Sequence, residues 1–261
     1  MIRSLRAGLL GGALLLGLAA SAAQAHSPYL LPSVFDASDR TLVTVEGAFT
    51  ESFFTPEVVM KSDAYAVIGP DGVRTPLAPT YLRQLAVAEI VTDKPGTYRI
   101  TTGQRAGRVA KAALVDGDWK FFEGDKAPAD AIDMQSLTTA EVYVTRGAPS
   151  DAALAPIGRG LEFRAITHPS KIVTGRDAVF EVLFDGEPLA GQAVILSAAD
   201  DRYADAKPAP KTFIADAKGR LTLKVERSGV YQIQARHRVA PAGPGQAGQS
   251  HTYALTFESL R

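Results

Sequence analysis

The sequence contains no cysteine, which removes several kinds of chemistry at once. Disulfides, thiolate metal sites, iron–sulfur clusters and cysteine nucleophiles are all excluded. The fold must therefore be stabilised by apolar burial. A metal site has to use histidine, carboxylate or backbone groups as ligands.

The chain also lacks an excess of charge of either sign, with 28 Lys and Arg against 28 Asp and Glu. Neither this balance nor the value of about −2 that remains without Arg3 and Arg6 indicates nucleic acid or an anionic membrane as a partner. No nucleophile elbow, phosphate-binding loop or paired-carboxylate hydrolase motif is present. We therefore predict a binding protein that is not an enzyme.

The first 25 residues have the features of a secretory signal peptide. Arg3 and Arg6 precede an apolar, glycine-rich run over residues 7–20, and small residues surround Gln24 at the end of the segment. The run is shorter than the roughly 20 residues that cross a bilayer. We predict cleavage after Ala25, a mature chain of 236 residues without a transmembrane segment, and a periplasmic location.

Helical periodicity is nearly absent from the rest of the chain, where short β-branched and aromatic runs alternate with turn residues. The acidic, Ala-rich stretch 123–137 has no clear period and predicts a surface loop or a short helical turn. In the first half, strands are predicted over residues 41–49, 64–68, 85–91, 97–101, 111–115, 119–122 and 141–144.

The segment after Gly160 has a clearer β pattern. A strand around residues 179–183 leads to a turn at 185–186, and residues 189–196 form the return strand. Alternating apolar residues over 221–225 indicate one buried sheet face. This segment is typical of an immunoglobulin-like or prealbumin-like sandwich.

The predicted fold class is all-β, with two β-sandwich domains. The Ala-, Pro- and Gly-rich composition of residues 147–159 is typical of a linker. We predict a signal peptide at 1–25, an N-terminal β domain at 26–146, this linker, and a C-terminal β-sandwich domain at 160–261.

Long stretches of the chain resemble the periplasmic family called domain of unknown function 4198. They are the mature start AHSPYLLPS and the segments GRGLEFRAITHPSKIVTGRDAVFEVLFDGEPLAGQAVIL and TFIADAKGRLTLKVERSGVYQIQARHR. Members are associated with nickel and cobalt uptake, some as accessory proteins of nickel transporters, so the resemblance implies a periplasmic, metal-related role. Members often carry an aromatic-rich AH.FWL segment, whereas this chain has HSPYL from His26, so the choice of metal does not carry over.

His26 is the most informative residue, because cleavage after Ala25 makes it the first residue of the mature protein. Its α-amino group and imidazole Nδ1 can then chelate one metal ion, since both nitrogens lose their protons near neutrality. Nitrogen ligands of this kind suit Cu(II), Ni(II), Co(II) and Zn(II). An exposed terminal histidine without a ligand role is the alternative.

Two more histidines are candidates for the same site. His237 and His251 come near each other if the strands around them pair as a hairpin across residues 240–248. His168, just before a proline, is a weaker candidate, and ordinary surface histidines are the alternative for all three. Further possible ligands are the acidic residues Asp36, Asp39, Glu46 and Glu51. The default interpretation of these four is that they are solvated residues at strand edges.

We therefore predict a periplasmic protein that binds a divalent transition metal, nickel, cobalt or copper, through His26, His237 and His251. It would support metal uptake or delivery by passing the ion to a metal transporter or an outer-membrane receptor. The alternative is a metal-free cell-envelope interaction or structural module. A third hypothesis is oxidative chemistry on a polysaccharide at a terminal-histidine copper site.

Overall fold

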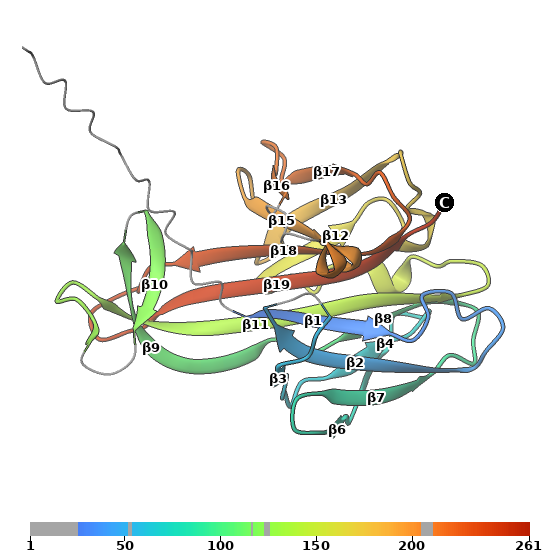
Figure 1. Cartoon of the computed structure of the whole chain (residues 1–261), viewed down its shortest axis with the longest axis horizontal. Helices are drawn as coiled ribbons and strands as arrows, with labels where there is room; N and C mark the ends of the chain where they lie inside the picture. Colours follow the sequence, from blue (N-terminus) through green and yellow to red (C-terminus); the bar gives the residue numbers. More distant parts are fainter. Residues whose placement is uncertain (1–25, 52–53, 116, 123–125, 205–210) are drawn as a thin grey trace, which may run out of the picture.

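The computed structural model describes residues 26–51, 54–115, 117–122, 126–204 and 211–261. The predicted signal peptide lies outside these residues. The described part is built of three β-sheets, with short 3-10 helices and no α-helix, and the all-β prediction is confirmed (Figure 1). In the same part of the chain, no helix has the length and apolar character needed to cross a membrane.

A five-stranded sheet contains the start of the described chain. Its order is β1-β2-β7-β6, and β3 pairs with β2. Two predicted strands, at 41–49 and 85–91, are confirmed within it as β2 and β7. The strands are β1 (Ser27–Pro32), β2 (Leu42–Thr50), β3 (Val58–Val59), β6 (Thr80–Tyr81) and β7 (Ala86–Val91).

A ten-stranded sheet forms the central layer, with the order β16-β15-β18-β19-β11-β8-β4-β5; β9 also pairs with β11, and β10 pairs with β9. All its pairs are antiparallel except β11 with β19. The strands are β4 (Ala66–Ile68), β5 (Arg74–Pro76), β8 (Gly96–Thr101), β9 (Arg105–Val115), β10 (Asp118–Phe122), β11 (Ile132–Arg146), β15 (Ala193–Ala198), β16 (Lys211–Ile214), β18 (Gly229–Val239) and β19 (Gly248–Ser259).

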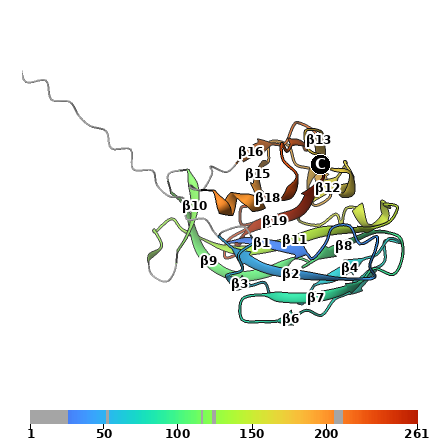
Figure 2. The same cartoon turned by 45° about the vertical axis from the view of Figure 1, so that its right-hand side comes forward.

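A four-stranded sheet covers one face of the central sheet, as two views show (Figures 1 and 2). Three 3-10 helices, η2 (Ala152–Leu154), η3 (Pro169–Lys171) and η4 (Ala199–Tyr203), lie in the connections. The strands of this sheet are β12 (Leu161–Ala165), β13 (Asp177–Phe184), β14 (Glu187–Pro188) and β17 (Arg220–Lys224).

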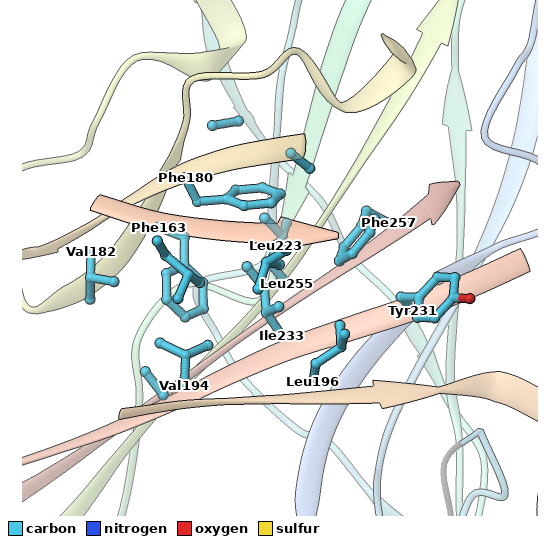
Figure 3. Close-up of a cluster of buried hydrophobic side chains, with 14 of the residues drawn as sticks. Phe163, Phe180, Val182, Val194, Leu196, Leu223, Tyr231, Ile233, Leu255 and Phe257 are labelled. Atoms are coloured by element: carbon cyan, nitrogen blue, oxygen red, sulfur yellow. The ribbon is translucent and has the colours of Figure 1, made fainter. Parts of the chain in front are cut away.

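Two hydrophobic cores separate the three layers. One lies between the four-stranded sheet and the central sheet, and Figure 3 shows Phe163, Phe180 and Phe257 within it. The other fills the space between the central sheet and the five-stranded sheet, around Ile100 and Val142. Since successive side chains of a strand point to opposite faces, a central strand such as β11 contributes to both cores.

The structure corrects two details of the predicted strand pattern. The stretch 123–137, predicted as a loop or helical turn, contains the first residues of β11 from Ile132 onward. The predicted return strand at 189–196 pairs with β16 and β18 as β15, and only β14 pairs back with β13. The division into domains at 147–159 stays a prediction, and both predicted domains contribute strands to the central sheet.

Candidate metal centre

His26 lies at the start of β1, beside the end of β2. The register pairs Ser27 with Thr50, which brings the His26 side chain to Glu51. Its Nε2 lies 3.7 Å from Oε1 of Glu51 and 3.1 Å from Oε2 of Glu57. Among the described residues, these three side chains form the only group of three or more His, Asp or Glu residues whose ligand atoms all lie within 4.8 Å of one another.

Backbone hydrogen bonds hold Glu57 in place at this group. Its N–H donates to the carbonyl of Phe49 at 3.1 Å, and its Oε1 accepts from the backbone N–H of Glu51 at 2.9 Å. The other carboxylate oxygen is the one that faces His26. The side chains of His26, Glu51 and Glu57 are 42%, 57% and 33% exposed, so an ion from solvent reaches them directly.

His237 and His251 are directly opposite each other on β18 and β19, so the predicted hairpin is confirmed. The Phe184 ring contacts both imidazoles, with centroid distances of 4.6 Å to His237 and 5.1 Å to His251. Nε2 of His251 lies 3.0 Å from Oε1 of Gln249. Burial lowers the pKa of both histidines, which favours the neutral imidazoles that bind metals.

The structure brings together two of the three predicted histidine ligands and places the third apart from them. His237 and His251 face the four-stranded sheet, where they meet Phe184. His26 lines a pocket with Arg236 and Thr252, whose side chains alternate to the opposite face of the same two strands. Instead of the two histidines, His26 meets Glu51 and Glu57.

His168 has a local structural role. Its Nδ1 accepts a hydrogen bond at 3.1 Å from the backbone N–H of Ser170 and so caps η3, and its Nε2 lies 3.0 Å from the hydroxyl of Thr97. Burial lowers its pKa. Both ring nitrogens are therefore occupied by partners within the fold.

A pocket of about 470 Å³ opens beside His26. We call it the arginine pocket because Arg105, Arg108 and Arg236 line it, together with hydroxyl side chains of β11 and β19. Its floor is the face of the central sheet that looks toward β1 and β2. Sequence reasoning missed this pocket, because it arises from the pairing of the distant strands β11 and β19. It also missed Glu57, whose position depends on the pairing of β3 with β2.

Comparisons with known proteins give a family and weak structural likenesses. A family model described as domain of unknown function (DUF4198) matches residues 23–239. No curated protein matches the chain.

Among solved structures, the tetra-tandem repeat in the extending region of a large adhesion protein is 10% identical, with a TM-score of 0.25 over 90% of this chain and 49% of that chain. This chain thus spans about half the length of that structure. The D0-D1 domain of intimin is 11% identical, with a TM-score of 0.23 over 89% of this chain and 97% of that one. A DUF4785 family protein from Legionella pneumophila is 8% identical, with a TM-score of 0.24 over 79% and 50% of the two chains.

Proposed function

Because the chain belongs to the DUF4198 family, whose description names no activity, we propose a function from the geometry at His26. The protein binds a divalent transition metal ion in the periplasm and serves nickel, cobalt or copper uptake or delivery. It acts as a binding protein and not as an enzyme. The observation that carries the proposal is the meeting of His26 with Glu51 and Glu57.

The donor set supports this proposal. An imidazole and two carboxylates are borderline and hard ligands that suit Zn(II), Co(II) and Ni(II). The three donor atoms come from the residue before β1, the residue after β2 and the residue before β3, so paired strands hold them near one another. Metal–ligand bonds of about 2.0 to 2.2 Å require donors that lie a few ångströms apart, as these do.

Removal of residues 1–25 adds a second way to bind the ion. The new α-amino group and Nδ1 of His26 then chelate the metal, and Nε2 donates a hydrogen bond to Glu57. A carboxylate in this position orients the ring. This mode favours Cu(II) and Ni(II), whereas binding through Nε2 and the two carboxylates favours Zn(II) and Co(II). The two modes use opposite nitrogens of one ring.

Calorimetric titration with Ni(II), Co(II), Cu(II) and Zn(II) tests the proposal. The protein forms are the chain beginning at His26, the same chain with one extra N-terminal residue, and Glu57→Gln, with Glu89→Gln on the exposed face of β7 as the control. Binding abolished by the extra residue identifies chelation by the terminus. Binding that survives the extra residue and is lost in Glu57→Gln identifies the Nε2 mode.

A titration in which no form binds any of the four metals would contradict the proposal. The metal-free cell-envelope interaction module would then be the better hypothesis. Delivery of the ion to a transporter or outer-membrane receptor requires that the protein binds a metal, so it is tested only after binding is seen.

A further inference from the structure

The floor of the arginine pocket is a row of polar residues across four paired strands. Arg236 on β18 is opposite Thr252 on β19, Thr252 is opposite Thr138 on β11, and Thr138 is opposite Arg105 on β9. Neighbouring strands lie about 4.8 Å apart, so the two arginine backbones at the ends of the row are separated by about 14 Å. An arginine thus stands at each end of the row, with two hydroxyls between.

A second row of hydroxyls extends the same floor. Ser250 on β19 is opposite Ser136 on β11, and both side chains line the pocket. Gly107 on β9 lies against Ser136, and a Cβ there would come within 3.2 Å of the Ser136 Cβ. The glycine therefore permits the close approach of β9 that completes the floor.

The lining of the pocket is cationic. Among the described residues that line it, three are arginines and none carries a carboxylate. The half-buried Arg236 donates from Nε to the hydroxyl of Thr252 at 3.0 Å, and no carboxylate of the described chain is within ion-pair distance of it. Burial and the nearby Arg238 lower its pKa, as expected of a cation whose charge is not offset.

Arg105 is held over the pocket from the other end of the row. Its Nε donates to the carbonyl of Lys61 at 2.9 Å, and its guanidinium lies 5.5 Å from the centroid of the Phe49 ring. A guanidinium fixed by one hydrogen bond and one aromatic face presents its remaining N–H groups in a defined direction. The two ends of the row are therefore preorganised.

We propose that the arginine pocket binds a small organic polycarboxylate. Planar guanidinium groups pair with carboxylates through two parallel hydrogen bonds, and the hydroxyls between them bind the middle of such a ligand. A single phosphate or sulfate engages one end of the row, whereas a ligand with carboxylates on a short carbon chain engages both. A volume of about 470 Å³ holds a molecule of that size.

The position of His26 at the pocket gives the polycarboxylate a role in the proposed function. His26 lines the pocket and also faces Glu51 and Glu57. A polycarboxylate bound along the row therefore lies next to an ion at His26, and the ligand class is an anionic metal–polycarboxylate chelate. This role rests on the proposed metal site, whereas the anion site itself stands on the arginines and hydroxyls of the pocket.

Calorimetry with citrate, on protein freed of metal by a chelating resin, tests the anion site. We expect one citrate per chain, with an affinity that falls as NaCl is added, because the attraction is electrostatic. Arg236→Gln is expected to weaken citrate binding at least tenfold, as is Arg108→Gln, which replaces an exposed side chain. Arg227→Gln, whose exposed arginine pairs with Asp200 elsewhere, is the control and is expected to bind citrate as the natural protein does.

Three results would overturn the anion site: no citrate binding, citrate binding unchanged in both pocket variants, or inorganic phosphate binding as tightly as citrate. None of them affects titration of the protein with Ni(II) alone, which tests the proposed function separately. A further titration with nickel citrate tests the chelate. Binding at least tenfold tighter than that of citrate alone supports it, and equal binding of the two probes limits the pocket to the free anion.

Discussion

The two faces of the central sheet carry arginines in opposite electrostatic settings. Toward the four-stranded sheet, Arg99 is 1% exposed, and its Nε lies 2.6 Å from Oε2 of Glu141. Its Nη1 donates to the carbonyl of Ala155 at 3.0 Å, and Nη2 lies 3.8 Å from Oε2 of Glu162. Toward the five-stranded sheet, Arg236 has only the neutral Thr252 hydroxyl as its side-chain partner among the described residues.

This difference separates a structural arginine from one suited to a ligand. A buried cation is costly unless carboxylates and hydrogen bonds offset the lost hydration. Arg99, on β8, has both, and its carboxylate partners come from β11 and β12, so the network joins the central sheet to the four-stranded sheet. Arg236 has no such partner and borders a pocket, so an anion from solution can supply the missing charge.

The largest effect is expected from removing the compensated arginine. Arg99→Met leaves Glu141 and Glu162 buried without their cation, and we expect the free energy of unfolding to fall by about 3 to 5 kcal/mol. Urea denaturation measures it. Adding Glu141→Gln to this variant removes one of the stranded charges and should recover part of the loss. A loss below about 1 kcal/mol in Arg99→Met would show that the network contributes little.

A smaller effect is expected from a hydroxyl of the same network. Tyr253 donates a hydrogen bond to the carboxylate of Glu141. Tyr253→Phe removes it, and we expect a loss of about 2 kcal/mol, as for hydrogen bonds to charged groups. Tyr143→Phe is the matched control, because the Tyr143 hydroxyl is buried with no hydrogen-bond partner in the described structure. Equal losses in the two variants would mean that the Glu141 contact has no special strength.

The uncompensated arginine should respond differently. Arg236→Met removes a half-buried charge and one hydrogen bond, two effects of opposite sign, so we expect the free energy of unfolding to change by no more than about 1 kcal/mol. Citrate binding should be lost in the same variant. A loss of stability above about 3 kcal/mol would remove the distinction between the two arginines.

The sequence predicts what depends on neighbouring residues and misses what depends on distant pairing. Strand β2 follows from its alternation, and the β9–β10 hairpin follows from two apolar runs beside a turn. The parallel pairing of β11 with β19 joins segments more than 100 residues apart, and no local pattern indicates it. In the sequence, each arginine of the pocket has the pattern of an ordinary surface charge. Only the pairing of β11 with β19 aligns Arg236 with Arg105.

Strand pairing also decides how much of the metal centre the sequence predicts. His26 stands out in the sequence because it follows the predicted cleavage site, and Glu51 is among the acidic candidates near it. Glu57 has no sequence signal, because the pairing of Phe49 with Val58 is what turns it toward His26. The predicted proximity of His237 and His251 is confirmed, but strand alternation directs them to the face opposite His26.

The smallest effect is expected from acidification, which acts on the face that carries Arg99. Burial lowers the pKa of His237; at His251 burial also dominates, Asp185 opposes the shift and His237 adds to it. The unfolded chain therefore binds protons at these positions more readily than the folded protein. The free energy of unfolding should therefore decrease as the pH falls below the ordinary histidine pKa of about 6.5.

Urea denaturation between pH 7.5 and 5.5 should show a steeper loss of stability for the natural protein than for the double variant His237→Gln/His251→Gln, in which only the other titrating groups remain. Parallel curves for the two proteins would show that the pair titrates alike in both states, and that its burial on the Arg99 face carries no cost for a new charge.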